Sequence, residues 1–304
     1  MFDRIKGALY GFAIGDAMGA TTKFMNEEEI IHKYGKVTDI IGGGWLDLEQ
    51  GQVTDDTQMT LCVCRALEES IQIRDHRKSN DMFYELCCKY FVEWFDSDPV
   101  DIGNCCRNII TTCKNKNFRD WVQTAFNPSS LGNGSLMRSM PLVLANQTIY
   151  TALNQGRLTH NNDVCDECIE EYYRLLEKCL FFDFTKCSDN LVLDNPTGHV
   201  KNSLNNAKYW LFETNSFKEA IIGAVNHGGD SDTIAAISGS MAGAYYGFND
   251  IPDKWIYQLN SKVKKQLDHY ADYFLPICEI YKMHIDERNE TRFQPINGGM
   301  IHNE

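Results

Sequence analysis

Two short acidic motifs contain the residues best suited to chemistry. One is TDDT at residues 54–57, and the other is DSDT at residues 230–233, which follows a pair of glycines. Each motif places two carboxylates and neighbouring hydroxyl groups directly before an apolar run with helical periodicity. For one motif alone, a helix cap with acidic residues in the first turn is an equally good interpretation. A cap needs only one side-chain oxygen, so two motifs of this composition are harder to explain as caps.

If the two helix starts meet, the motifs predict a site for hard divalent cations. Four carboxylates, with Asp16 as a further candidate, would repel one another and take up protons unless cations compensated them. The available ligand atoms are all oxygen, so Mg²⁺, Mn²⁺ and Ca²⁺ are the ions that fit. The spacing lacks the glutamate of an EF-hand loop, which disfavours calcium sensing. Two ions about 3.5–4 Å apart could hold and activate a water molecule.

Three further segments could complete a ligand site. The glycine-rich residues 131–138 (LGNGSLMR) lead into an expected helix, where free N–H groups suit a pyrophosphate, although a lone Gly-x-Gly is better explained as a plain turn. His160 lies beside two asparagines, where a surface-loop histidine is the simpler interpretation. Asp101 falls in the first turn of a helix expected after Pro99 and could belong to a site or merely favour the helix dipole.

The elements that must position these groups are expected to be helices. Helical periodicity predicts them at residues 2–19, 56–77, 81–96, 99–115, 134–146, 163–181, 200–213, 217–226, 231–247 and 255–283, the last one broken. No convincing alternating strand is present; residues 37–41 (VTDII) are the best short candidate and could equally be a loop. We therefore expect an all-α fold with one domain over residues 1–287 and a loosely ordered tail over residues 288–304.

Two glycine stripes predict which helices lie together. Glycines recur every four residues at Gly7, Gly11, Gly15 and Gly19, and again at Gly239, Gly243 and Gly247. Each costs a helix up to about 1 kcal/mol relative to alanine, so a stripe needs a reason. Dimerising membrane spans would be one such reason, but acidic groups stand at the ends of both helices. We expect instead two central helices packed backbone to backbone, with the loops at their ends converging.

Composition narrows the range of partners. The chain has 304 residues and a formal net charge of −13, which disfavours a nucleic-acid partner, while a small anionic ligand held by backbone N–H groups and cations remains compatible. No stretch is long and apolar enough to span a bilayer. The twelve cysteines are expected to be reduced core thiols, and the C-x-x-C at 165–168 has no second pair. Acidic residues interrupt the apolar N-terminal segment, so we expect a cytoplasmic protein rather than a secreted one, and a monomer.

Together these motifs resemble the ADP-ribosylglycohydrolase family, the group that includes the dinitrogenase-reductase-activating glycohydrolase. The matching stretches run from residue 7 to residue 247 in the order GALYGFAIGDAMGA, GQVTDDTQMTL, DIG, GNGSLMRSMPL, RLTHNN and AVNHGGDSDTIAAISGSMAGAYYG. The resemblance implies an orthogonal multi-helix bundle, all-α, in a single domain with a two-metal centre that holds Mg²⁺ or Mn²⁺.

The resemblance also implies roles for individual residues. By motif position the metal ligands are Thr54, Asp55, Asp56, Asp230, Asp232 and Thr233. The expected substrate-binding residues are Gly132, Asn133, Gly134, Ser135, Leu136, Met137 and His160, with Gly134 and Ser135 along the phosphates of ADP-ribose. Asp101 matches the aspartate that faces the guanidinium in arginine-directed members. The expected catalytic residues are Asp55, Asp56 and Asp101.

The implied reaction is metal-dependent hydrolysis of the N- or O-glycosidic bond that joins ADP-ribose to a protein side chain, arginine in the first place. One departure matters: where the family has a glutamate before an aromatic residue, this chain has Lys23 before Phe24. Glu27, Glu28 and Glu29 follow too late to be assumed replacements. A non-catalytic ADP-ribose-binding pseudoenzyme is therefore the alternative. An aspartyl-phosphate phosphohydrolase is a third hypothesis, but its D-x-D motif should follow a strand in an α/β fold.

Overall fold

The computed structural model describes residues 1–72, 81–187 and 191–292, and within these ranges the chain is all-helical, without a β-strand. The predicted all-α class is therefore confirmed. The elements are α1 (Phe2–Gly19), α2 (Glu27–Tyr34), α3 (Asp55–Gln72), α4 (Asp81–Phe95), α5 (Asn104–Cys113), α6 (Phe118–Thr124), α7 (Met140–Leu144), α8 (Ile149–Gly156), α9 (Asp163–Phe181), α10 (Val200–Phe212), α11 (Phe217–His227), α12 (Ser231–Tyr246), the 3₁₀ turn η1 (Phe248–Asp250), α13 (Asp253–Gln258) and α14 (Ser261–Arg292).

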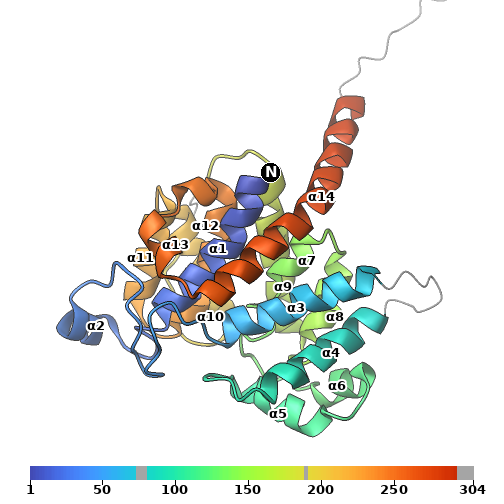
Figure 1. Ribbon diagram of the computed structural model, residues 1–304, viewed down its shortest axis with the longest axis horizontal. Helices are drawn as coiled ribbons and strands as arrows, with labels where there is room; N and C mark the ends of the chain where they lie inside the picture. Colours follow the sequence, from blue (N-terminus) through green and yellow to red (C-terminus); the bar gives the residue numbers. More distant parts are fainter. Residues whose placement is uncertain (73–80, 188–190, 293–304) are drawn as a thin grey trace, which may run out of the picture.

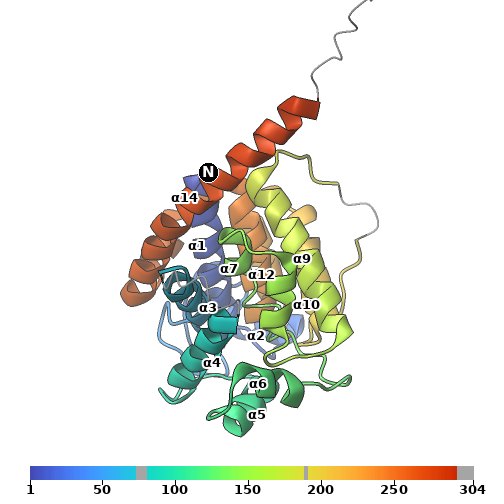
Figure 2. The same ribbon diagram turned by 90° about the vertical axis from the view of Figure 1, so that its right-hand side faces the viewer.

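Helices α1 and α12 run side by side through the middle of the bundle (Figures 1 and 2). Their backbones touch along the glycine stripes: a methyl group added at Gly11 would lie 2.1 Å from the carbonyl oxygen of Gly239, and one at Gly7 would lie 2.1 Å from that of Gly243. These pairs run in opposite directions along the chain, so the helices are antiparallel. The predicted backbone-to-backbone packing of these two helices is confirmed.

The antiparallel pairing brings the end of α1 to the start of α12. A methyl group added at Gly19 would lie 2.4 Å from the carbonyl oxygen of Ser231. The loop after α1 is then tied to the glycine turn before α12, because the amide of Phe24 donates to the carbonyl of Gly229 at 2.6 Å, and the amide of Gly229 donates to that of Met25 at 2.8 Å. Gly229 has a φ of +64°, a conformation that glycine adopts without strain.

The remaining helices surround this pair. In Figure 1 the long helix α14 crosses over α1, while α3 and α4 lie together on one side and α2 stands at the opposite edge. Figure 2 shows α9 and α10 beside α12. None of the described helices combines the length and hydropathy needed to cross a bilayer.

Several predicted boundaries were wrong. The helix expected at 99–115 begins only at Asn104. The one expected at 134–146 is helical only over Met140–Leu144, since the amides of residues 136 and 137 both turn back to the carbonyl of Asn133. Three short helices, α2, α6 and α8, were missed. The predicted break within the helical segment 255–283 is confirmed, because Leu259 and Asn260 separate α13 from α14.

Two expectations fall at the limits of the described chain. Helix α14 continues to Arg292, beyond the expected start of an irregular tail at residue 288, while residues 293–304 lie outside the described residues. The end of the helix predicted over 56–77 also falls in an undescribed range, after Gln72. Residues 37–41 form no strand.

Candidate active site

The buried carboxylate of Asp16 positions the first acidic motif. It projects from α1 and accepts hydrogen bonds from the backbone amides of Thr54 at 3.1 Å and Thr57 at 3.0 Å. The hydroxyls of the same two threonines also donate to it, at 2.9 and 2.5 Å. One carboxylate therefore fixes the N-terminus of α3 against α1, where acidic groups also favour the helix dipole.

The second acidic motif meets the first across this junction. The hydroxyl of Thr233, in the first turn of α12, donates to Oδ2 of Asp56 at 3.2 Å, and Oγ1 of Thr54 lies 3.2 Å from the same oxygen. One oxygen from each of Asp16, Asp56 and Asp232 lies within 4.8 Å of the others. The expectation that the two helix starts converge is thus confirmed by the geometry.

The arrangement of these carboxylates fits a divalent cation. Oδ1 of Asp56 and Oδ1 of Asp232 are buried and have no hydrogen-bond partner among the described residues. Buried acceptors are normally satisfied, and burial raises the pKa of Asp56 well above its usual range and that of Asp232 to about 8. All the donors are oxygens, as Mg²⁺ and Mn²⁺ prefer. Asp16, Asp56 and Asp232 are therefore the residues that would hold an ion, with Thr233 orienting Asp56.

Lys23, in the loop after α1, reaches the carboxylates that meet at this junction. We call these carboxylates the acidic cluster: Asp16, Asp55, Asp56, Asp101, Asp230 and Asp232. Its Nζ lies 2.7 Å from Oδ2 of Asp232, 2.7 Å from Oδ2 of Asp101 and 3.8 Å from Oδ1 of Asp230. Burial alone would lower the pKa of Lys23, but the surrounding carboxylates, Asp232 first, raise it above its usual value. Its side chain is 8% exposed. The lysine is thus a buried, positively charged part of the site.

Asp55 and Asp101 lie on the α5 side of the cluster. Oδ2 of Asp55 accepts the backbone N–H of Gly103 at 3.1 Å, and Oδ1 of Asp101 accepts that of Ile102 at 2.8 Å. Burial, and then the charge of Asp101, raise the pKa of Asp55 to about 7. The side chain of Asp101 is 20% exposed, so it belongs to the site without being sealed in it.

The glycine-rich loop is joined to the acidic cluster through Asn133. Its side-chain amide donates to Oδ2 of Asp230 at 2.5 Å and to the hydroxyl of Ser203 at 2.9 Å. Leu136 and Met137 differ from the expectation for substrate-binding residues, since their side chains are in the core and their amides both donate to the carbonyl of Asn133. Gly132, Asn133 and Gly134 are partly exposed, while Ser135 is buried like the two residues that follow it.

His160 packs beneath this loop and is buried, contrary to the surface-loop interpretation. A methyl group at Gly132 would lie 3.1 Å from its Nε2. Burial, and then the charge of Arg138, lower the pKa of His160 to about 3, so the ring is neutral. Arg138 donates to Oγ1 of Thr159 at 2.7 Å, and the same oxygen lies 2.8 Å from Nδ1 of His160. The other ring nitrogen, Nε2, faces Gly132 of the loop.

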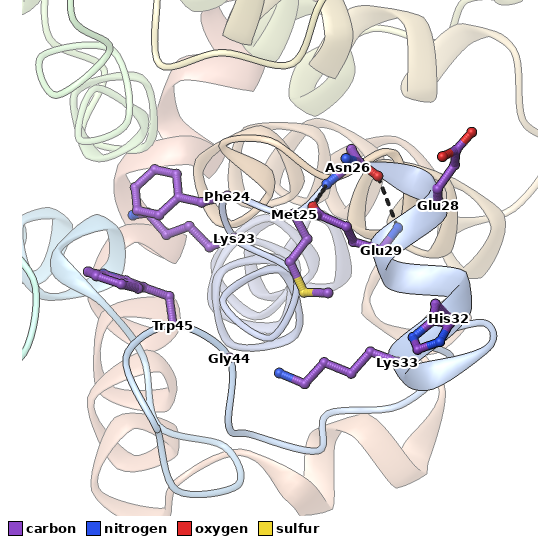
Figure 3. Close-up of a pocket in the computed structure, with 10 residues that line it drawn as sticks. All are labelled: Lys23, Phe24, Met25, Asn26, Glu28, Glu29, His32, Lys33, Gly44 and Trp45. Atoms are coloured by element: carbon purple, nitrogen blue, oxygen red, sulfur yellow. Dashed lines mark hydrogen bonds between the residues drawn. The ribbon is translucent and has the colours of Figure 1, made fainter.

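A cavity of about 760 Å³ opens beside Lys23 (Figure 3). Its wall includes two exposed aromatic residues, Phe24 and Trp45, whose ring centroids lie 6.3 Å apart. A second cavity, of about 930 Å³, has Phe24 in its wall and reaches Gly198 and Asp230. Lys23 and Asp230 therefore line spaces large enough for a nucleotide-sized ligand, whereas Asp16, Asp56 and Asp232 are buried behind them.

Two features of the site were not anticipated from the sequence. The sequence indicates Asp16 only as a possible fifth carboxylate of the metal site, yet in the structure it organises the N-terminus of α3. Arg138 had been only the last residue of the glycine-rich segment, yet it is fully buried and donates to the carbonyl of Gly134 and to Thr159. The available signal was the position of Arg138 within a largely apolar segment, residues 136–144 (LMRSMPLVL), which is typical of a buried side chain that supports the loop.

Comparisons with known proteins agree with this fold. The family model described as ADP-ribosylglycohydrolase matches residues 1–180 and 166–284. The ADP-ribosyl-[dinitrogen reductase] glycohydrolase of Rhodospirillum rubrum is 33% identical over 304 aligned residues, which cover 91% of this chain and 97% of that protein. The ADP-ribosylarginine hydrolase Tri1 of Pseudomonas putida (strain GB-1) is 29% identical over 84% of this chain and 73% of its own length. A solved structure titled ADP-ribosylglycohydrolase-related protein complex superposes with a TM-score of 0.73 and 25% identity, covering 91% of this chain and 98% of that one.

Proposed function

The chain belongs to the ADP-ribosylglycohydrolase family of hydrolases, and we propose that it removes ADP-ribose from modified protein side chains, arginine in the first place, in a metal-dependent reaction. The observation that carries this proposal is the convergence of Asp16, Asp56 and Asp232 around buried carboxylate oxygens that lack partners. The names of two relatives, which specify dinitrogen reductase and ADP-ribosylarginine, support the same substrate class.

Different residues of the chain would have different roles in such a reaction. When bound, a divalent cation supplies an activated water and neutralises charge. Asp16 holds the first motif in place through Thr54 and Thr57, while the hydroxyl of Thr233 orients Asp56. Asp55 is 5% exposed at the same helix start, and its raised pKa makes it able to accept a proton near neutral pH.

The substrate would be held along the glycine-rich loop. Backbone N–H groups in this segment suit a pyrophosphate, and Nε2 of the neutral His160 ring lies directly beneath Gly132. Because Asn133 ties the loop to Asp230, a ligand held there is positioned against the acidic cluster. Asp101, which is partly exposed, is the group that would face the departing guanidine as a charge partner or proton donor.

A direct test is incubation of the protein with a defined ADP-ribosyl-arginine peptide, with and without added Mg²⁺ or Mn²⁺. We expect free ADP-ribose to form only with added metal, and Asp232→Asn to prevent its formation. Release at the same rate in the presence of a chelator would contradict metal dependence. A parallel reaction on an ADP-ribosyl-serine peptide tests the linkage, and faster release from serine would contradict the arginine preference.

A second candidate function is binding of ADP-ribose without cleavage. The direct contacts of Lys23 with Asp101 and Asp232 favour it, because a cation already occupies part of the expected metal centre. Calorimetric titration with ADP-ribose separates the two candidates when it is run beside the hydrolysis assay. Tight binding without release from either peptide at saturating metal would favour the binding protein.

A further inference from the structure

The ammonium group of Lys23 lies within the acidic cluster and not at its edge. Three carboxylates from two separate segments surround it: Asp101 from the loop before α5, and Asp230 and Asp232 from the start of α12. Two of the three distances are those of direct, charge-assisted hydrogen bonds. Such an arrangement of anionic oxygens around one positive centre is what a bound cation would also require.

We propose that this ammonium takes the place of one of the two divalent ions expected for the family, so that the chain binds a single divalent ion per molecule. The inference rests on the proposed function in one respect, namely that the acidic cluster is a metal centre. It goes beyond it by assigning the number of ions and by making Lys23 a built-in substitute for the second one.

The distribution of carboxylate oxygens supports one remaining ion site. Asp101 and Oδ2 of Asp232 are engaged by Lys23. Oδ1 of Asp232 and Oδ1 of Asp56 have no partner among the described side chains, and both belong to residues grouped with Asp16. Both unsatisfied acceptors therefore belong to the group of three carboxylates that converges with Asp16, where they can serve one ion. A second dication that used Asp101 or Oδ2 of Asp232 would have to displace Lys23, and an ion bound beside them would meet its positive charge at short distance.

The lysine is held in this position by its surroundings. On one side of it, the hydroxyl of Thr22 donates to the carbonyl of Val225 at 2.7 Å; on the other, the amide of Phe24 donates to the carbonyl of Gly229. The ring of Phe24 lies with its centroid 5.4 Å from Nζ. Figure 3 shows the side chain running beside Phe24 and away from Glu28 and Glu29. The α2 glutamates therefore neither pair with Lys23 nor stand in for the family's glutamate.

The glutamates of α2 cannot take the place of the glutamate that Lys23 replaces, as the contacts of Glu29 and Glu27 show. Its carboxylate accepts the backbone N–H of Asn26 at 2.8 Å, as part of a capping box that begins the helix. Oε1 of Glu27 lies 2.9 Å from Nδ1 of His227 in a partly exposed pair. Both groups have structural partners outside the acidic cluster, so Lys23 itself determines the charge at this place.

The test is the stoichiometry of Mn²⁺ in the full chain, measured by equilibrium dialysis and by electron paramagnetic resonance at saturating Mn²⁺. We expect one Mn²⁺ per chain with the spectrum of an isolated ion. Lys23→Glu and the neutral Lys23→Gln should each raise the number to two, with the spectrum of a magnetically coupled pair. Lys33→Glu is the matched control, because Lys33 lines the same cavity but is exposed, and it should leave one ion bound.

The outcomes separate this inference from the proposed function. Two Mn²⁺ ions in the unmodified chain would overturn the inference alone, as would a single ion in both Lys23 variants when circular dichroism shows them folded. No bound Mn²⁺ in the unmodified chain would overturn the inference together with metal dependence. If both variants failed to fold, the stoichiometry of the unmodified chain would still decide the matter, because one and two ions give different spectra.

Discussion

The hydroxyl of Thr233 donates a hydrogen bond to Oδ2 of Asp56 at 3.2 Å and so joins the start of α12 to the start of α3, 177 residues apart in the chain. This bond uses only one oxygen of the carboxylate. The other oxygen is buried without a partner among the described residues. The link therefore orients Asp56 so that its free oxygen is available to a ligand.

Asp56→Asn should weaken Mn²⁺ binding at least about 100-fold, because it removes one of the three carboxylates that converge at the site. The melting temperature of the ion-free protein should stay the same or rise, since the pKa of Asp56 is raised by burial and its charge is unfavourable in the folded state. Calorimetric titration and thermal melting measure the two quantities. Asp272→Asn, on an exposed face of α14, is the control that should change neither. Unchanged Mn²⁺ affinity in Asp56→Asn would remove this residue from the metal site.

The stability of the ion-free protein should fall as the pH rises from about 5 to 8. Burial raises the folded-state pKa of Asp55 to about 7 and of Asp232 to about 8, above the unfolded value of about 4. A carboxyl group with a raised pKa contributes stability at pH values below its unfolded pKa, and this contribution is lost as the pH rises through the folded pKa. Thermal melting in a chelator measures the trend.

Bound Mn²⁺ should reverse much of this loss, because the ion favours the deprotonated carboxylates. The gain in melting temperature on adding saturating Mn²⁺ should therefore be larger at pH 8 than at pH 5.5. The double variant Asp56→Asn, Asp232→Asn is the matched control and should show a flatter pH profile without the Mn²⁺ response. An equal Mn²⁺ gain at both pH values would contradict the link between these protons and metal binding.

The sequence predicted the convergence of the two acidic motifs because two simple rules acted together. A four-residue glycine period fixes one face of a helix, and the close approach of two such faces fixes how the helices pair. Where Lys23 points could not be predicted in this way. Its long side chain has several rotamers, and only the carboxylates brought by α5 and α12 select among them. Burial of His160 likewise depends on Arg138 and on the packing of the loop above it.

The short helices were missed for a related reason. Helix α2 buries only Ile30, so its apolar periodicity is weak, although the capping box from Asn26 to Glu29 is visible in the sequence. Helices α6 and α8 are seven and eight residues long, and their clearest signals are the capping side chains of Asn117 and Thr148. Local caps were thus better indicators than periodicity for helices of this length.

Gly11→Ala should destabilise the protein by about 1–3 kcal/mol or more, because the added methyl group would meet the carbonyl oxygen of Gly239 at 2.1 Å and force the central helices apart. Chemical denaturation measures this free energy of unfolding. Gly103→Ala is the control, since an added methyl group there meets nothing within 4 Å. Equal stability of the two variants would contradict the close packing of α1 against α12.

Gly134→Ala should weaken binding of ADP-ribose about 10-fold or more with little loss of stability. The added methyl group would lie 3.0 Å from Cε1 of His160 and 3.1 Å from the sulfur of Cys106, so the loop would have to lift away from the histidine beneath it. Calorimetric titration with ADP-ribose measures the affinity, and thermal melting shows whether the fold is kept. A variant that binds ADP-ribose as tightly as the unmodified chain would place the pyrophosphate elsewhere.

Asp101→Asn should slow release of ADP-ribose from arginine about 100-fold or more while changing the affinity for free ADP-ribose less than about threefold. The carboxylate is partly exposed beside the cluster and would face the leaving guanidine, which free ADP-ribose lacks. The substitution also removes one partner of Lys23, so the number of Mn²⁺ ions bound by Asp101→Asn must be measured beside its rate of release. Single-turnover release and calorimetric titration should be run on this variant and on the unmodified chain. If Asp101→Asn bound a different number of Mn²⁺ ions, or reduced release and affinity equally, Asp101 would act by supporting the site and the preference for arginine would lose its structural basis.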